Sequence, residues 1–465
     1  MKPTPAGAHE KALQINREAT RYGTFVEVGA GQEVARWFFH VGGAAGTVAK
    51  TMSAYDMAVS DAIYGPCPRY VSRQRLHAML DREWGLLLKR LDRARGNRTR
   101  FFVFADTVAT RSYTRREDGH GWLGIRFQTS PRAKPSEIVI HARLWDQDNA
   151  RQQEALGRLG VNLIHAAFYL HRQPARLIGA LMDGLTRNRM EVDMVKCSGP
   201  AFAGVDPRLL TLQLIHQRLT NAAFFTAAGE VVEPAEVLHR RPVLIERGSF
   251  RPITNVTLDM LERTRKQMHA DPRRGGENPV VLMEMTLRHL LGTQTSIDHA
   301  DFLARVDTLG LLGHTVMISN YSRFHSVASY LRRYTDKPVA MVLGLPTLAA
   351  LFEEKHYTDL EGGILEAFGR LFRGAVRLYI YPWRHPSHGE IVSAASFKAP
   401  ARLRHLYAHL LGNGFIVPIA DFDRTNLDIL PGEVLRRIQT GKTGWERMVP
   451  APVVARIQRD RLFGW

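Results

Sequence analysis

The chain contains only two cysteines among its 465 residues, Cys67 and Cys197. Two cysteines cannot form a disulfide framework, and their separation matches no zinc-binding pattern. The sequence also lacks any run near the roughly 18 uncharged apolar residues that a membrane-spanning helix needs. Its first ten residues contain no apolar stretch of the kind found in secretory signals. From these absences we expect a cytoplasmic protein with no membrane insertion and no structural metal site.

The chain also has fewer acidic than basic residues. It contains 45 Asp and Glu and 63 Lys and Arg, which give a formal net charge of +18. A surplus of positive charge attracts nucleic acid, nucleotides and other phosphate-bearing molecules. Most of the basic residues are arginines, however, and they are spread along the whole chain rather than gathered in one block. We therefore favour a nucleotide or another phosphate-bearing small molecule as partner over nucleic acid, and we expect a homo-oligomer.

The length predicts two or three domains, and the hydrophobic content of 45% is enough for substantial cores. We place a mixed α/β domain at residues 1–238, with glycine-rich loops near its start. Three strands at 100–106, 122–128 and 137–144 have turn-rich separators, which predicts an antiparallel meander. The apolar run 161–168 predicts a further strand after a helix.

Residues 239–465 show a more regular rhythm, which predicts a Rossmann-like nucleotide-binding domain with a C-terminal extension. Strand-like apolar runs alternate with helical patterns, and such an alternation is typical of βαβ units and a doubly wound, mostly parallel sheet. The expected strands are 243–245, 280–285, 315–319, 339–343, 376–381 and 415–419.

The most informative segment is 247–263, which reads RGSFRPITNVTLDMLER and follows the first of these strands. A strand, a glycine-containing turn and a helix start together form a common phosphate-binding arrangement, because the first helical turn offers unpaired N–H groups. Gly248 allows close backbone approach to a phosphate, and Thr254 or Asn255 can cap the helix. Arg247 and Arg251 can pair with phosphate oxygens.

This segment resembles the first signature of the nucleotidyltransferase superfamily that includes nicotinate-nucleotide and phosphopantetheine adenylyltransferases. In that signature a Gly-[Ser/Thr]-Phe-Asp-Pro-[Ile/Val]-Thr-x-Gly-His run precedes a helix. Thr254 matches the family threonine, whereas Val256 replaces glycine, Thr257 replaces the catalytic histidine, and Arg251 replaces the acidic residue. The resemblance implies ATP and Mg²⁺ as cofactors. It also implies catalytic roles for Thr254, Thr257 and Arg251, and cofactor binding by Arg247, Gly248, Ser249, Phe250 and Asn255.

The family's second signature, Ile-Ser-Ser-Thr-x-x-[Arg/Lys], has a partial counterpart in residues 318–323, ISNYSR. It implies cofactor-binding roles for Ser319, Ser322 and Arg323, although the arginine lies one residue early. We therefore expect a nucleotide-binding protein, with adenylyl transfer from ATP to a nicotinate-type nucleotide as its reaction. The alternatives are a non-catalytic nucleotide-binding or assembly protein, an RNA-binding protein, or an enzyme that uses S-adenosylmethionine.

The last alternative rests on residues 25–31, FVEVGAG, which resemble the first motif of S-adenosylmethionine methyltransferases. Residues 42–51 are also glycine-rich but lack the glycine before Lys50 that a P-loop requires. Asp106, at the end of a predicted strand, is a candidate catalytic carboxylate or helix cap. The pairs His385/His388 and His289/His299 have no accompanying cluster that indicates a metal site.

Overall fold

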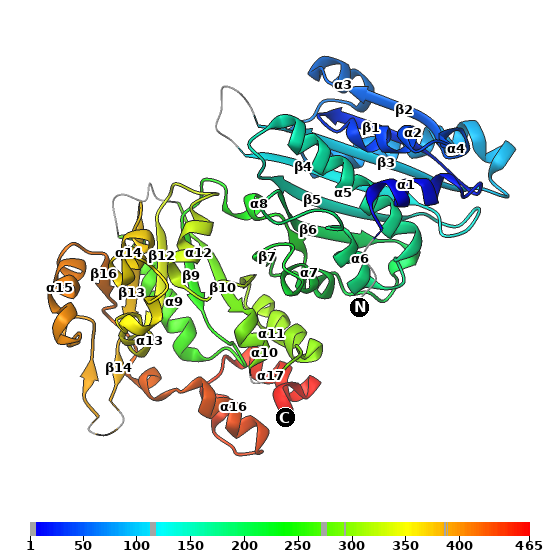
Figure 1. Cartoon of the computed structure of the whole chain (residues 1–465). Coiled ribbons are helices and arrows are strands. Elements are labelled where there is room, and N and C mark those ends of the chain that lie inside the picture. Colours follow the sequence, from blue (N-terminus) through cyan, green and yellow to red (C-terminus); the bar gives the residue numbers. More distant parts are fainter. Residues whose placement is uncertain (1–5, 112–117, 271–276, 293, 386, 388) are drawn as a thin grey trace. The chain divides into compact units, whose positions relative to one another are not determined.

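The structure is a computed structural model that describes residues 6–111, 118–270, 277–292, 294–385, 387 and 389–465. The chain divides into two compact units, residues 1–221 (unit 1) and 222–465 (unit 2). Each unit has its own sheet and its own hydrophobic core. The two sheets are visible in Figure 1. The expected fold class, a mixed α/β domain followed by a doubly wound, mostly parallel one, is confirmed. No helix within the described ranges is long and apolar enough to cross a bilayer.

The described part of unit 1 forms a six-stranded sheet in the order β2-β1-β3-β4-β5-β6. Its strands are β1 (Arg21–Gly29), β2 (Val48–Ala54), β3 (Arg100–Ala109), β4 (Gly119–Phe127), β5 (Ser136–Leu144) and β6 (Met190–Ser198). Strand β1 pairs in parallel with β2 and β3, whereas β3 to β6 pair antiparallel in sequence order. The predicted meander is therefore confirmed, and it continues into β6.

Helices cover both faces of this sheet. They are α1 (Ala8–Asn16), α2 (Glu33–His40), α3 (Met57–Tyr64), α4 (Arg73–Arg95), α5 (Asn149–Tyr169), α6 (Pro174–Ala180) and α7 (Pro207–His216). Alternate residues of β4 point to opposite faces. Leu123 and Ile125 join the core formed with α1, α2 and α5, while a Cβ on Gly124 would meet Leu76 and Leu80 of α4 at 3.1 and 3.0 Å.

The prediction of a strand at 161–168 is wrong, because these residues form the second half of helix α5. The helix is buried on almost every side in this stretch. Leu163, Ile164 and Phe168 belong to the core, as do the alanines between them. A helix buried all round has no polar face, so its apolar run shows no helical periodicity in the sequence.

Unit 2 contains an eight-stranded sheet, within the described residues, in the order β16-β13-β12-β9-β10-β11-β7-β8. Its strands are β7 (Ala222–Phe225), β8 (Val231–Val232), β9 (Val243–Arg247), β10 (Val280–Thr286), β11 (Thr315–Ser319), β12 (Val339–Gly344), β13 (Val376–Tyr381) and β16 (Ile416–Pro418). Strands β14 (Trp383–Arg384) and β15 (Ile391–Val392) form a separate hairpin. The six strands from β9 to β13 and β16 are parallel, and their order reverses between β9 and β12.

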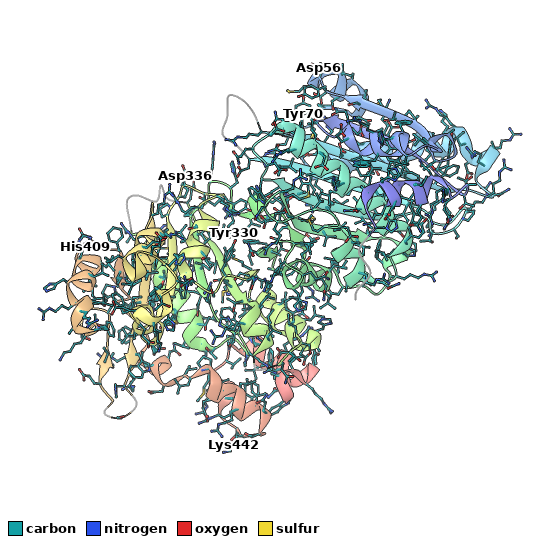
Figure 2. The ribbon with its side chains drawn as sticks, in the orientation of Figure 1. Asp56, Tyr70, Tyr330, Asp336, His409 and Lys442 are labelled. Carbon is teal, nitrogen blue, oxygen red and sulfur yellow. The ribbon has the colours of Figure 1, made fainter. Side chains whose placement is uncertain are left out.

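The helices of unit 2 fill the connections between strands. They are α8 (Pro234–Leu238), α9 (Asn255–His269), α10 (Leu287–Leu291), α11 (His299–Leu311), α12 (Phe324–Leu331), α13 (Leu345–Leu351), α14 (Gly363–Leu371), α15 (Arg404–Gly412), α16 (Pro431–Gln439) and α17 (Ala451–Asp460). One core joins a face of the sheet to α12, α13, α14 and α15. Tyr330 of α12, labelled in Figure 2, packs in this core against Phe224 and Tyr334, with ring centroids 6.3 and 5.3 Å apart.

The boundary between the units lies at 221/222, whereas the sequence pattern placed it at 238/239. Strand β7 explains the difference, because it pairs antiparallel with β11 and so extends the second sheet. Strand β8 pairs with β7 in turn. A short edge strand that joins a sheet in the antiparallel sense does not share the strand–helix rhythm of the parallel strands, so that rhythm starts only after it.

Candidate functional site

The turn after β9 lies at the carboxyl edge of the parallel sheet, beside the point where the strand order reverses. Strand β9 ends at Arg247, and helix α9 begins at Asn255 after a turn. The predicted strand, turn and helix are therefore present. In doubly wound sheets, ligands bind outside the carboxyl ends of the strands at such a reversal. The sequence-predicted residues of this edge differ in the contacts that they make.

Arg247 lies in a cluster that joins the two signature-like segments. Its guanidinium donates to both carboxylate oxygens of Glu284 in β10, at 2.9 and 2.8 Å, and to the backbone carbonyl of Ser322 at 3.1 Å. The hydroxyl of Ser319 donates to the same carboxylate at 2.6 Å. The guanidinium also lies 4.5 Å from the ring centroid of Phe324. The structure thus brings Arg247, Ser319 and Ser322 together, with Glu284 as the common partner of Arg247 and Ser319.

The first turn of α9 is covered by a C-terminal segment of the same unit. The backbone N–H of Asn255 donates to the carbonyl of Met448 at 2.8 Å, and its side-chain amide donates to the carbonyl of Arg447 at 2.9 Å. Nearby Trp445, in the short 3₁₀ helix η7 (Trp445–Arg447), is fully buried. The N–H group of Asn255 that a phosphate would use is therefore bonded within the protein.

The predicted catalytic threonines, Thr254 and Thr257, are both buried. Thr257 hydrogen-bonds the carboxyl group of Glu246, whose pKa is raised well above its ordinary value by burial despite that bond. The hydroxyl of Thr254 has no hydrogen-bond partner among the described residues. Thr254 precedes α9 as its N-cap residue but forms no side-chain cap. Neither hydroxyl is positioned on an open surface.

The remaining predicted residues of the turn contact helix α11 or pack on themselves. Arg251 donates to Asp301 of α11 at 2.5 Å. Phe250 is buried, and a Cβ on Gly248 would lie 2.7 Å from its ring, so glycine is required by the packing of this turn. Ser249 is exposed and accepts a hydrogen bond through its carbonyl from Arg305 at 3.3 Å. Arg251 and the two threonines therefore make contacts in different parts of the unit.

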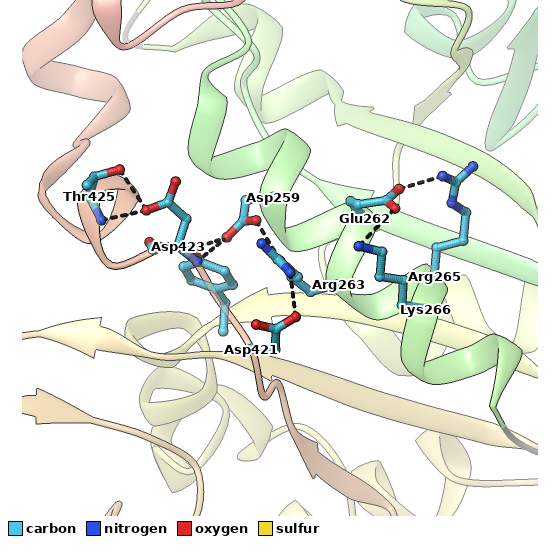
Figure 3. Close-up of polar contacts among 9 residues, drawn as sticks. Asp259, Glu262, Arg263, Arg265, Lys266, Asp421, Asp423 and Thr425 are labelled. Carbon is cyan, nitrogen blue, oxygen red and sulfur yellow. Dashed lines mark hydrogen bonds and ion pairs between the residues drawn. The ribbon is translucent and has the colours of Figure 1, made fainter.

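The helix half of the motif, Leu258 to Arg263, has a clear structural role (Figure 3). Asp259 accepts hydrogen bonds from the hydroxyl of Tyr381 at 2.6 Å, from the backbone N–H of Asp423 at 3.0 Å and from Arg263 at 2.9 Å. Arg263 also pairs with Asp421 at 2.6 Å. Burial opposes ionisation of Asp259, but these bonds outweigh it and lower the pKa. The acidic and basic residues of the motif hold the loop after β16 against α9.

A cavity of about 360 Å³ adjoins the Arg247 cluster at the carboxyl edge. Arg288 after β10, Ser322 and Arg323 after β11, and Thr347 after β12 line it, together with the rings of Phe324 and Tyr357. Arg323 pairs with Asp359, and its guanidinium lies 5.9 Å from the ring centroid of Tyr357. Arg288 is exposed and forms no ion pair with any described residue.

No carboxylate lines this cavity among the described residues, while two guanidinium groups do. Two histidines, His325 and His356, complete its polar lining. Burial, followed by the charge of Arg323, lowers the pKa of His325, so this ring is uncharged at neutral pH. The volume lies within the range of small-molecule sites, and the lining combines aromatic faces with cations. Such a lining is suited to a planar, anionic ligand.

Sequence reasoning missed Glu284, Arg288 and Tyr357. Glu284 carried a usable signal, because it is the only charged residue inside the apolar run 280–286. A carboxylate in a central strand requires a partner, and here Arg247 and Ser319 provide it. Arg288 and Tyr357 carried no signal, because only the fold brings the loops after β10 and β12 together.

The glycines of residues 25–31 in unit 1 are explained by packing. Gly29 has a φ of 85°, and a Cβ there would lie 2.2 Å from the carbonyl oxygen of Val108. A Cβ on Gly31 would lie 1.8 Å from a carboxyl oxygen of Asp106. Strand β1 runs directly beside β3 in this region, with Glu27 opposite Asp106. The close approach of two strands, rather than of a cofactor, accounts for both glycines.

Glu27 and Asp106 form a buried pair of carboxyl groups on adjacent parallel strands. Burial, with a further contribution from the charge of Glu33, raises the pKa of Glu27 to about 7. Burial and the neighbouring Glu27 raise the pKa of Asp106 well above its ordinary value. Neither carboxyl oxygen of Asp106 has a hydrogen-bond partner within the described residues. Asp106 is thus a buried acid rather than a helix cap.

The other candidate positions make contacts within the protein. Lys50, in the glycine-rich segment, forms an ion pair with Glu83 of α4. His289 accepts a hydrogen bond from the backbone N–H of Thr286 at 3.4 Å, and His385 accepts one from that of Ser387 at 3.3 Å. His388 lies outside the described residues.

No protein-family profile matches the chain, and no curated protein matches it. Among solved structures, it is similar to the competence/damage-inducible protein CihA from Agrobacterium tumefaciens, at 18% identity and a TM-score of 0.25. That alignment covers 36% of this chain and 98% of the other. A CinA-superfamily protein from Enterobacter cloacae aligns at 11% identity and a TM-score of 0.26, covering 36% of this chain and 95% of the other.

Proposed function

We propose that unit 2 is a nucleotide-binding domain whose ligand occupies the cavity beside the Arg247 cluster. The observation that supports this proposal is the lining at the reversal of strand order, where two arginines and two aromatic rings converge and no described carboxylate is part of the lining. The carboxylate that pairs with Arg323, that of Asp359, is exposed and does not line the cavity. Guanidinium groups suit phosphate oxygens because they offer parallel donors, and aromatic rings suit a base because they stack on it. Arg288 and Arg323 bind the phosphates in this proposal, and Tyr357 and Phe324 contact the base.

The role of the Arg247 cluster in this proposal is positional. Arg247 holds the carbonyl of Ser322 and the ring of Phe324, both of which belong to the loop and helix that line the cavity. Because Glu284 satisfies both Arg247 and Ser319, these two predicted residues orient the loop after β11. They do not reach a ligand directly.

ATP is the first ligand to test, and adenylyl transfer to a nicotinate-type nucleotide is the reaction that the sequence resemblance suggests. Mg²⁺ is held in proteins chiefly by carboxylates together with substrate phosphates. The described lining offers no carboxylate, so the residues present do not fit a protein-held Mg²⁺. The buried threonines and the covered start of α9 likewise favour binding over transfer. We therefore propose nucleotide binding as the primary function.

Calorimetric titration of the full chain with ATP tests the proposal. Replacing Arg288 or Arg323 by alanine is expected to weaken ATP binding about tenfold each, since a charge-assisted hydrogen bond contributes about 1.5–3 kcal/mol. Arg265→Ala is the matched control, because Arg265 is an exposed arginine of α9 that pairs with Glu262 away from this cavity. Its effect is expected to stay below about twofold.

Two results would count against the proposal. One is an absence of heat of binding at about 5 mM ATP while circular dichroism shows a folded protein. The other is an equal loss of affinity in all three arginine variants, which would indicate a general effect of charge. A separate assay for pyrophosphate release from ATP, with a nicotinate nucleotide as acceptor, decides whether binding is accompanied by transfer.

A further inference from the structure

A second and larger cavity, of about 530 Å³, also borders helix α10. Arg288 of this helix lines the first cavity, and the next residue, His289, lines the second. The second cavity is bounded by the turn after β9, by α10, by α11 and by α16 of the C-terminal extension. Ser249 and Arg251 of the turn contribute to it. Two sequence-predicted residues therefore line a cavity that the nucleotide proposal does not use.

The charged groups of this cavity are unevenly compensated. Arg251 and Arg305 both pair with one carboxylate, that of Asp301, and the side chains of Arg305 and Asp301 are 4% and 8% exposed. Asp298 also lines the cavity, but it is exposed, and its Oδ1 accepts the backbone N–H groups of Ala300 and Asp301. Solvent screens an exposed charge far more than a buried one. Two guanidinium groups thus share one buried carboxylate.

Arg305 also has an unused donor. Its Nη1 donates to the carbonyls of Ser249 at 3.3 Å and His289 at 3.0 Å, but its Nε has no partner among the described residues. This nitrogen is inaccessible to solvent, so it does not face the cavity. Burial, partly offset by Asp301, lowers the pKa of this guanidinium. An anion bound beside Arg251 and Arg305 would balance the second of the two guanidinium charges that Asp301 alone compensates.

His289 supplies a further donor. Its Nδ1 accepts the N–H of Thr286, which places the ring proton on Nε2. Burial, followed by the charge of Arg247, lowers the pKa of His289, so the ring is neutral at neutral pH. Leu290 and Leu435 contribute an apolar wall to the same cavity.

We infer that this cavity binds a small molecule that carries an oxyanion, either a phosphate or a carboxylate, held by Arg251 and Arg305. The ligand's apolar portion lies against the leucine wall. The inference does not depend on the nucleotide site, because the two cavities have different linings.

Gly432 in α16 offers a test that leaves the charged groups intact. It lines the cavity, and an added Cβ there meets no atom within 4 Å. Gly432→Phe is therefore expected to fill part of the cavity, whereas Gly432→Ala is the matched control that keeps it open. Calorimetry of the full chain with inorganic phosphate and, separately, with succinate at constant ionic strength identifies the preferred oxyanion. Gly432→Phe is expected to weaken binding at least about tenfold and Gly432→Ala less than about twofold.

Arg251→Met provides an independent measurement, because Arg251 is partly exposed and its replacement removes one cation while keeping apolar volume. It is expected to weaken anion binding about tenfold and to leave ATP binding unchanged. Equal anion affinity in the two Gly432 variants overturns the inference. So does an absence of binding of either anion at about 10 mM by the folded protein. Loss of anion binding in Arg323→Ala instead of Arg251→Met would assign the anion to the nucleotide cavity, and would also overturn it.

Discussion

Glu27 and Asp106 show how strongly single residues in unit 1 depend on their neighbours. Each is an ordinary acid in the sequence, and the structure places them opposite each other on β1 and β3 with almost no access to solvent. Two carboxyl groups in such a site cannot both ionise at low cost, so at least one stays protonated near neutral pH. This state couples the stability of unit 1 to pH.

The pKa of Glu27 predicts the direction of that coupling. Because it rises from 4.5 to about 7 on folding, the folded state binds more protons than the unfolded state between these values. Stability is then fully present below about pH 4.5 and decreases as pH rises toward 7. At about 1.4 kcal/mol per pKa unit the loss is about 3 kcal/mol. Glu27→Gln is expected to remove the part of this dependence that Glu27 contributes, whereas the part from the buried Asp106 remains.

Urea unfolding at pH 5 and pH 8 measures this coupling. Hydrogen exchange of peptides from β1 and β3 is the readout for unit 1. The wild-type midpoint is expected to be lower at pH 8, and the difference between the two midpoints is expected to be smaller in Glu27→Gln. Wild-type stability that rises from pH 5 to pH 8 in these peptides would contradict the assigned protonation.

At the scale of elements, the turn between β1 and α2 is set by contact with β3. An added Cβ at Gly31 would lie 1.8 Å from a carboxyl oxygen of Asp106, so the turn, the strand or this buried carboxyl group must shift. Gly31→Ala is expected to destabilise unit 1 by about 1–3 kcal/mol, as overpacking typically does. Thermal unfolding combined with hydrogen exchange at β1 checks this.

Gly85 provides the control for this prediction. It lies in the middle of α4, is exposed, and an added Cβ meets no atom within 4 Å. Gly85→Ala is therefore expected to stabilise α4 by up to about 1 kcal/mol, because alanine has the higher helix propensity. If both variants changed stability in the same direction, the close approach of Gly31 to Asp106 would not be the controlling factor.

The elements of unit 2 were easier to predict than those of unit 1. Every parallel strand expected from the apolar runs between 243 and 419 is present within a few residues, because a strand covered on both faces is apolar throughout and is separated from the next by a helix. The same reasoning failed at 161–168. There an apolar run of similar length belongs to α5, and the sequence holds no local feature that separates a buried helix from a buried strand.

At the scale of the whole molecule, the boundary at 221/222 predicts which fragments fold. A fragment that starts at residue 239 lacks β7 and β8, so it exposes the edge of β11 and loses Phe224 from the core. An unprotected edge strand promotes association with other chains. A fragment of residues 222–465 is expected to be monodisperse and cooperative in unfolding, whereas residues 239–465 are expected to aggregate. Size-exclusion chromatography and calorimetry of both fragments compare them directly, and equal behaviour would show that β7 is dispensable.

The sequence alone determined the fold class, the parallel strands of the second sheet and the strand, turn and helix at 243–269, because these depend on local periodicity and on turn residues. It also assigned Arg247, Ser319 and Ser322 to cofactor binding. Only the tertiary structure decided their partners. Glu284 takes up Arg247 and Ser319, a C-terminal segment covers Asn255, and Arg251 pairs with α11. These contacts join residues far apart in the chain, and no pattern within a single segment records them.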